Sequence, residues 1–234
     1  MDPDTRQSSE EPFADDGAPI CRIRVWDLPT RLFHWLLVLS VAICFVTGII
    51  GVAAMSLHML SGLVVLGLLL FRIFWAFVGG RQSRFTAFVR GPRAILRYAV
   101  DMLRGSAPRY LGHNPLGGWS VLAMLLALAV QVSTGLFASD DILTEGPLYH
   151  LVDSTVAQQL TRIHRFNRFV VGILTGVHLL AIGFHLWVKR ENLIKPMITG
   201  NKDWPCDADA SSGNLWLAAA VAGLLAIGIY FLGR

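Results

Sequence analysis

The stretch RIHRFNRFVVGILTGVHLLAIGFHLWVKR, residues 162–190, carries two histidines fourteen residues apart, His164 and His178, within or beside a nearly charge-free apolar run. Fourteen residues are almost four helical turns, so the two side chains share one helix face about 21 Å apart along the axis. Ionisable side chains in a membrane span are costly and by default mark a functional site. The stretch therefore predicts a transmembrane helix that presents functional histidines at two depths.

The rest of the chain repeats this apolar character. Of its 234 residues 54% are hydrophobic and 15% charged, and the mean hydropathy is +0.54. Long runs without charges predict transmembrane helices rather than the amphipathic helices of a soluble domain. We expect five, over residues 32–53, 57–78, 119–138, 169–188 and 215–232. The predicted fold is an all-α integral membrane protein, a four-helix transmembrane bundle with an additional fifth C-terminal transmembrane helix.

Charge asymmetry between the connections predicts the orientation. The connection between the second and third helices carries seven arginines: Arg81, Arg84, Arg90, Arg93, Arg97, Arg104 and Arg109. The next connection is acidic, with Asp140, Asp141, Glu145 and Asp153. The positive-inside rule then places the N-terminus and the arginines in the cytoplasm, and the acidic loop and C-terminus in the periplasm. Membrane lipid explains the arginines, so no nucleic acid is expected as a partner.

Composition also divides the chain into parts. Residues 1–21 are acidic and rich in Pro and Ser, which predicts a disordered tail rather than a cleavable signal peptide. Residues 22–203 hold the four-helix membrane domain, and residues 204–234 a linker and the fifth helix. Within the domain, residues 83–103 predict amphipathic helices at the membrane interface, broken at Gly91–Pro92. Cys21, Cys44 and Cys206 form no CxxC pattern.

Four histidines fall into two pairs at matching depth. His58 opens the second helix and His164 precedes the fourth, so both lie near the outer face. His34 opens the first helix at the cytoplasmic face, and His178 lies about 21 Å deeper than His164. Two neutral imidazoles can hold a haem iron, so the pairs predict two bis-histidine haem b groups, one above the other.

The same fourteen-residue interval finds supporting residues on the other helices. It leads from His34 to Gly48, where a missing side chain would let a flat macrocycle approach. Gly62 lies one turn after His58 and would likewise relieve crowding near the outer haem. From His58 it leads to Arg72, whose charge would suit a haem propionate.

Other histidines leave alternatives open. His185 follows His178 by seven residues on the same face, so depth alone allows it to pair with His34. We expect it instead to contact a propionate or a quinone. His113 and His150 fall in loops and are expected to be ordinary surface residues. A lone histidine at a helix end is more often an interfacial residue than a ligand, but four in two matched pairs favour haem.

Several stretches resemble the bacterial cytochrome b561 family, and especially the membrane cytochrome b subunits of nickel–iron hydrogenases. They are VWDLPTRLFHWLLV (25–38), LHMLSGLVVLGLLLFRIFW (57–75) and residues 162–200, together with NPLGGWSVL and TGLFASDDI. The resemblance implies a four-helix di-haem protein with metal ligands His34, His58, His164 and His178, which favours His178 over His185. It also implies electron transfer between a periplasmic iron–sulfur subunit and a quinone reduced near the cytoplasmic haem.

Three hypotheses follow for the function. The first is a respiratory-chain electron carrier between a periplasmic partner, either a hydrogenase or dehydrogenase subunit or a cytochrome c, and the quinone pool. Arg165 and Arg168 would bind outer propionates and Arg72 an inner one. The second is a stand-alone quinol-linked oxidoreductase with a small oxidant as acceptor, so enzymatic activity as quinone reductase or quinol oxidase stays open. The third is a haem-free membrane anchor or transporter. The fifth helix is expected to dock a partner or a second copy in a homodimer.

Overall fold

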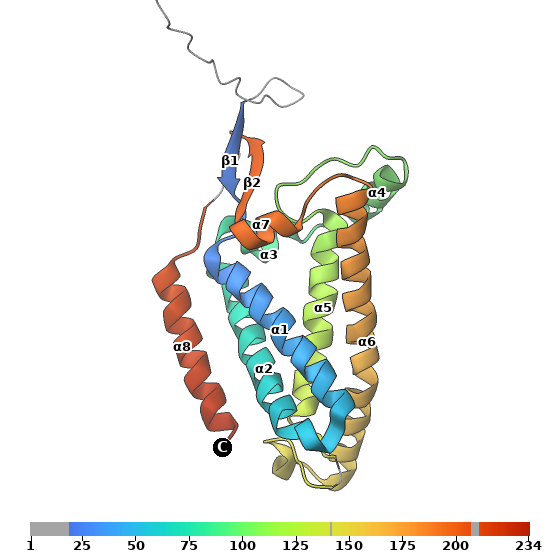
Figure 1. Ribbon diagram of the computed structural model, residues 1–234, viewed down its shortest axis with the longest axis vertical. Coiled ribbons are helices and arrows are strands. Elements are labelled where there is room, and N and C mark those ends of the chain that lie inside the picture. The colour runs from blue at the N-terminus through green and yellow to red at the C-terminus, as the bar shows by residue number, and fades with distance from the viewer. Residues whose placement is uncertain (1–18, 141, 207–210) are drawn as a thin grey trace, which may run out of the picture.

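The computed structural model describes residues 19–140, 142–206 and 211–234. Four long helices form a bundle, and a further helix packs on its outside (Figure 1). They are α1 (Leu28–Ile50), α2 (Met55–Val78), α5 (Pro115–Gly135), α6 (Ser154–Trp187) and, outside, α8 (Leu215–Leu232). In the described residues, four helical runs are long and apolar enough to span a membrane, and α1 and α2 together form the first of them. The prediction of a mostly helical chain with helices able to span a membrane is thereby confirmed.

The hairpin of α1 and α2 depends on one backbone conformation. Helix α1 ends at Gly51, whose φ of 79° is a left-handed value that glycine adopts without strain. A short 3₁₀ turn, η1 (Gly51–Ala54), then leads into α2, which runs back beside α1 (Figure 1). This reversal brings the C-terminal part of α1 next to the first turns of α2.

The two ends of the bundle differ as the charge pattern predicts. At one end lie the arginine-rich connection, with η2 (Arg81–Ser83), α3 (Phe85–Phe88) and α4 (Pro92–Leu103), and also α7 (Ile194–Thr199). An antiparallel strand pair, β1 (Ile20–Arg24) and β2 (Asn201–Pro205), extends from the same end. The opposite end holds the α1–α2 turn and the loop that contains η3 (Tyr149–Leu151) (Figure 1).

Some boundaries differ from those expected. Helix α6 begins at Ser154, long before its apolar part, because the Asp153 side chain caps its first turn by accepting from Thr155 N and Val156 N. His164 therefore lies inside a helix of 34 residues. Strand β1 begins at Ile20, so the end of the expected tail is ordered strand, and the first two linker residues belong to β2. The rest of the tail, residues 1–18, lies outside the described residues.

A disulfide that the sequence did not predict joins the strands. Cys21 and Cys206 are 185 positions apart, yet the pairing of β1 with β2 brings their Cα atoms to 4.8 Å. The bridge links the segment that precedes α1 in the sequence to the segment that follows β2, and it lies at the arginine-rich end of the molecule.

One buried carboxylate holds the helices together at that end. Asp27 is 4% exposed and caps α1 by accepting from Thr30 N. It also accepts from Trp75 Nε1 at 3.1 Å, from Gly80 N at 2.9 Å and from Gly213 N at 3.3 Å. It thereby joins the start of α1, the end of α2 and the segment that precedes α8.

Candidate functional site

The first histidine pair lies between α2 and α6. The imidazole rings of His58 and His164 lie next to each other, with centroids 6.2 Å apart and planes nearly perpendicular, at 84°. The sequence predicted this pair from depth alone, and the structure brings the two rings together. A centroid separation of 6.2 Å leaves room for one metal atom between the two rings, because metal–imidazole bonds are about 2 Å long.

Backbone carbonyls orient both rings. His58 Nδ1 lies 3.0 Å from Cys44 O, and His164 Nδ1 lies 2.9 Å from Gln131 O. A carbonyl only accepts, so each Nδ1 carries the hydrogen and donates it. In a neutral ring the lone pair then resides on Nε2. Metal-bound histidines are oriented in this way, with one nitrogen donating to a carbonyl and the other facing the metal.

Glycines on the neighbouring helices face these rings. A Cβ on Gly48 would lie 3.4 Å from His58 Cε1, and a Cβ on Gly135 would lie 2.9 Å from His164 Cε1. The sequence predicts Gly48 near this pair, whereas it gives no sign of Gly135. A Cβ on Gly62 would meet nothing within 4 Å among the described residues, so this glycine borders open space.

A pair of amides on α5 and α6 supports His164. Asn167 Nδ2 donates to Gln131 Oε1 and to Ala127 O, both at 2.8 Å. Gln131 Nε2 donates to His164 O at 3.1 Å. The same nitrogen is nearly equidistant from the two ring nitrogens, at 3.3 and 3.2 Å, so it lies over the ring rather than along the Nε2 lone pair.

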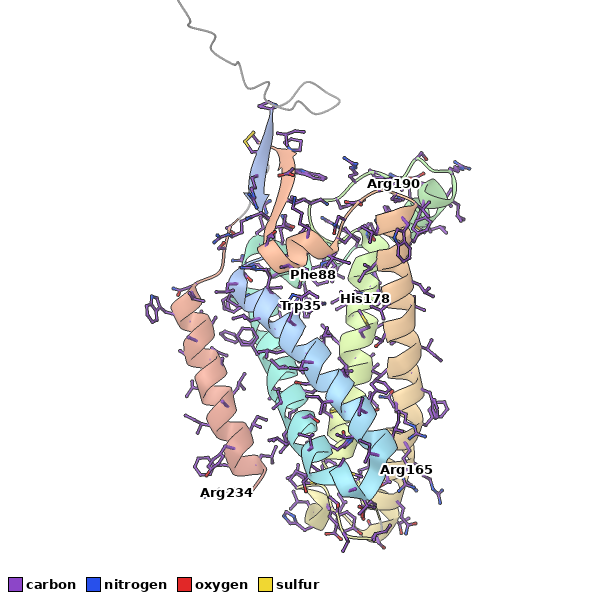
Figure 2. The ribbon with its side chains drawn as sticks, viewed as in Figure 1. Trp35, Phe88, Arg165, His178, Arg190 and Arg234 are labelled. Atoms are coloured by element: carbon purple, nitrogen blue, oxygen red, sulfur yellow. A yellow bond between two sulfur atoms is a disulfide. The ribbon has the colours of Figure 1, made fainter. Side chains whose placement is uncertain are left out.

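The second pair, His34 and His178, lies nearer the arginine-rich end. Figure 2 shows His178 at the level of Trp35, whereas Arg165 lies at the opposite end. His34 and His178 are close enough to interact electrostatically. Nδ1 of His34 is buried and has no hydrogen-bond partner among the described residues. Arg72 is 4% exposed at this level, and its Nη1 also lacks a partner there.

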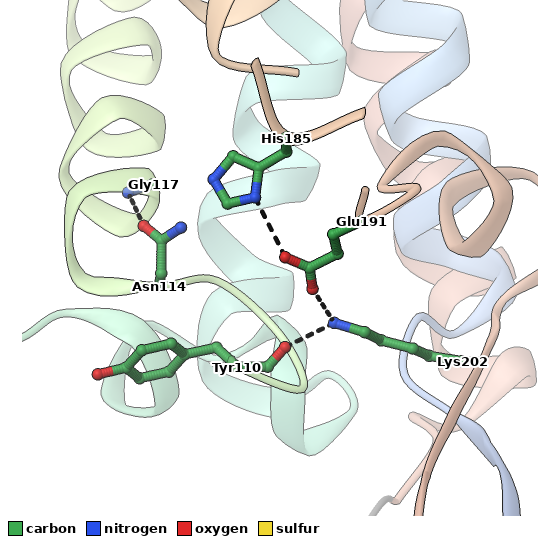
Figure 3. A network of polar contacts seen from close by, with 6 residues as sticks. All are labelled: Tyr110, Asn114, Gly117, His185, Glu191 and Lys202. Carbon is green, nitrogen blue, oxygen red and sulfur yellow. Dashed lines mark hydrogen bonds and ion pairs between the residues drawn. The ribbon is translucent and has the colours of Figure 1, made fainter. Parts of the chain in front are cut away.

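The imidazole of His185 contacts the carboxylate of Glu191 (Figure 3). Its Nδ1 lies 3.1 Å from Glu191 Oε2, and Glu191 Oε1 lies 2.8 Å from Lys202 Nζ. Lys202 in turn donates to Tyr110 O at 2.7 Å. The hydrogen bond from His185, followed by the contacts with Lys202, lowers the pKa of Glu191 to about 2. This network ties the end of α6 to β2, and it favours His178 as the partner of His34.

The position of His113 corrects an expectation. The sequence predicts an ordinary surface residue, but the His113 ring packs between Trp26 and Phe88, with centroids 4.9 Å from each. Its Nδ1 is buried without a hydrogen-bond partner in the described part of the chain. Burial first, and then the nearby charge of Arg72, lower the pKa of His113 to about 3. His150, by contrast, is exposed as expected.

The remaining candidate arginines lie beside His164. Arg165 and Arg168 are exposed and close enough to His164 to interact with it electrostatically. The guanidinium of Arg168 stacks 4.8 Å from the ring of Phe169. Both side chains are thus near the outer pair and accessible to an anion at its edge.

Known proteins resemble the chain over most of its length. Residues 25–200 match the family described as prokaryotic cytochrome b561. The chain belongs to this family. Among relatives named probable Ni/Fe-hydrogenase B-type cytochrome subunit, that of Rhodobacter capsulatus is 24% identical over 79% of this chain and 83% of its own. That of Azotobacter vinelandii is 28% identical over 76% and 87%. No solved structure matches.

A relative from Escherichia coli K12, named probable Ni/Fe-hydrogenase 1 B-type cytochrome subunit, is 29% identical over 47% of this chain and 57% of its own. Membership in the cytochrome b561 family implies haem b and membrane electron transfer. The donor set fits this group. His58 and His164 each donate Nδ1–H to a carbonyl, which leaves Nε2 as the acceptor, and unpartnered buried nitrogens of His34 and Arg72 lie at the inner pair. In a b-type cytochrome, the histidine nitrogens would hold the iron and the Arg72 nitrogen would donate to a haem carboxylate.

Proposed function

We propose that this cytochrome binds two haem b groups and carries electrons across the membrane between a periplasmic redox partner and the quinone pool. His58 and His164 would hold the outer haem, and His34 and His178 the inner one. The observation that carries the proposal is the geometry of the outer pair, in which two imidazoles have centroids 6.2 Å apart and each donates its Nδ1 hydrogen to a backbone carbonyl, so that Nε2 of each ring is left as the acceptor.

The protein's contribution is to orient, insulate and separate the two sites. When bound, haem iron held by two imidazoles supplies a one-electron couple. Carbonyls of Cys44 and Gln131 fix the tautomer and direction of the outer rings. In a membrane, the apolar helices would limit the access of water to both pairs. Since His164 and His178 are about 21 Å apart along α6, the two sites would lie near opposite membrane faces.

We assign each redox partner to one end of the molecule. Relatives are named cytochrome subunits of Ni/Fe hydrogenase, which supports a hydrogenase subunit as the electron donor. We place it at the end that holds residues 142–153, beside the outer pair. The arginine-rich end would face the cytoplasm by the positive-inside rule, and quinone would react there, near His34 and His178.

Counting haem in variants tests the proposal. The purified full-length protein should contain two haem b per chain by the pyridine haemochrome method. His58→Ala or His164→Ala should remove one haem and leave the other. His150→Ala is the matched control, because His150 is exposed in the loop at the same end, and it should retain both.

Two results would overturn the proposal. A wild-type protein with fewer than about one haem per chain would exclude the electron carrier, and loss of the inner haem upon His58→Ala would exclude the pairing. The partner is tested separately, by identifying the protein that co-purifies in mild detergent. A partner without a redox centre would contradict the assigned electron donor.

A further inference from the structure

Three buried nitrogens without hydrogen-bond partners lie around the inner histidine pair. Over residues 19–140, 142–206 and 211–234, the unpartnered buried side-chain nitrogens include His34 Nδ1, Arg72 Nη1 and His113 Nδ1. They come from α1, from α2 and from the segment that precedes α5. His113 is close enough to Arg72, His178 and His34 to interact with them electrostatically, and its ring and the Arg72 guanidinium both lie against Phe88, so the groups belong to one region of the bundle.

Arg72 has a charge that its neighbours leave only partly compensated. Its guanidinium lies over the rings of Phe85 at 5.4 Å and Phe88 at 6.0 Å. Asp27 interacts with it electrostatically, but the Asp27 carboxylate accepts from Thr30, Trp75, Gly80 and Gly213. A buried donor without an acceptor is costly, which points to an anionic ligand that accepts from Arg72.

His113 packs against Phe88, one of the two phenylalanines that lie beside Arg72. Its ring packs on Trp26 and on Phe88, and Phe88 also contacts the Arg72 guanidinium. The next residue, Asn114, caps α5 by accepting from Gly117 N at 2.7 Å (Figure 3). The capped helix start and the two rings fix the imidazole in place. A fixed, uncharged imidazole supplies one N–H donor to a ligand beside Arg72.

We infer that Arg72 and His113 together form a carboxylate site that receives a propionate of the inner haem. The inference rests on the proposed function, because it needs the inner haem between His34 and His178. Arg72 would supply the charge and His113 a second hydrogen bond, while Trp26 and Phe88 exclude water. A fork-shaped guanidinium beside a second donor matches the two oxygens of one carboxylate.

The outer pair has no equivalent of this site among the described residues. Its neighbouring arginines, Arg165 and Arg168, are exposed, and water weakens their charge. The buried site should therefore make the inner haem easier to reduce than it would be without Arg72 and His113. Its role is to position the haem and set its potential.

Redox titration of variants of the full-length protein tests the inference. His113→Leu should lower the midpoint potential of the inner haem and leave that of the outer haem unchanged. His113→Gln keeps an N–H donor and should restore most of the potential. Arg72→Gln should shift the inner potential further, by at least a tenfold change in the reduction equilibrium, about 59 mV for one electron. His150→Leu, at the opposite end, is the matched control.

A spectroscopic readout separates this role from a structural one. The propionate-bending bands in resonance Raman spectra should shift in His113→Leu and Arg72→Gln but not in His150→Leu. Unchanged inner potential and unchanged bands in both variants would overturn the inference, as would equal shifts of both haems. If His113→Leu does not fold, the comparison of Arg72→Gln with wild type decides in the same way. A haem-free wild type would instead overturn the proposed function itself.

Discussion

Gly135 of α5 lies so close to His164 of α6 that a Cβ on Gly135 would be 2.9 Å from Cε1 of the imidazole. Real Cβ atoms essentially never approach another heavy atom so closely. The ring cannot rotate away freely, because its Nδ1 donates to Gln131 O one helical turn before Gly135. The absence of a side chain at Gly135 is therefore what allows α5 to support the ring of a proposed metal ligand.

Gly135→Ala should consequently disturb the outer haem alone. The added methyl group must push the His164 ring or separate α5 from α6, and either movement changes the position of the His164 ring relative to His58. We expect partial or complete loss of one haem, measured by the pyridine haemochrome method and by the low-temperature spectrum.

Gly176→Ala provides the control for this change. A Cβ at Gly176, also in a bundle helix, would meet nothing within 4 Å in the described structure. The substitution should keep both haems and stabilise α6 by up to about 1 kcal/mol. If Gly135→Ala retained both haems with unchanged spectra, the close contact would have no role in ligand positioning.

The lowered pKa of Glu191 predicts that the folded protein loses stability in acid. Its pKa is lowered to about 2 by the hydrogen bond from His185 and then by Lys202. A carboxylate with a lowered folded-state pKa stabilises the fold above its unfolded value, here 4.5, and the contribution disappears as pH falls toward about 2. The melting temperature of the wild type should therefore decrease in this window.

Glu191→Gln should flatten that dependence. At neutral pH the variant leaves His185 and Lys202 with a weaker partner, so it should unfold more easily by roughly 1–3 kcal/mol. Glu145→Gln, an exposed side chain at the opposite end, should follow the wild-type curve. Parallel curves for wild type and Glu191→Gln between pH 4.5 and 2 would show that the network contributes nothing to the acid sensitivity.

Asp27→Ala should weaken the contacts between the start of α1, the end of α2 and the segment that precedes α8. It removes the acceptor for Trp75, Gly80 and Gly213 as well as the cap of α1. We expect a decrease of at least about 2 kcal/mol in the free energy of unfolding, with faster proteolysis before α8. Asp153→Ala, which removes only the cap of α6, should cost about 1 kcal/mol and leave α8 protected. Equal effects of the two variants would contradict a joining role for Asp27.

The sequence was sufficient for the features that depend on local periodicity. The fourteen-residue interval on one helix, together with the alternation of helix direction, predicted that His58 meets His164 and that Arg72 lies at the inner level. Features created by long-range packing were missed. The approach of Gly135 to His164 depends on how α5 packs on α6, and no spacing rule links the two residues.

The same reason explains His113 and the disulfide. His113 precedes the cap of α5 in a polar stretch that is typical of a surface, and only the positions of Trp26 and Phe88 cover it. Cys21 and Cys206 are separated by 185 positions, and the antiparallel register that pairs Cys21 with Trp204 cannot be inferred from either short strand alone. The one local signal for His113 is its place beside a helix cap, and such histidines are common on surfaces.

The Cys21–Cys206 pair provides a test of membrane orientation. Both cysteines lie at the arginine-rich end, which the positive-inside rule assigns to the cytoplasm. Thiols are kept reduced in the cytoplasm and form disulfides in the periplasm. With their Cα atoms 4.8 Å apart, the two cysteines can form the bridge wherever an oxidant is present. The proposed orientation thus predicts free thiols in growing cells and a disulfide after oxidation of isolated membranes.

Trapping with N-ethylmaleimide before lysis, followed by reduction and labelling with a maleimide-linked polymer, distinguishes the two states on a gel. With the proposed orientation, wild-type protein trapped in cells should match the Cys21→Ser/Cys206→Ser double variant, which retains only Cys44. Two additional labelled cysteines in the wild type would mean that the bridge exists in living cells. The arginine-rich end would then face the periplasm, and because the histidine pairs are fixed relative to that end, His58 and His164 would form the cytoplasmic site and the quinone and the redox partner would exchange places.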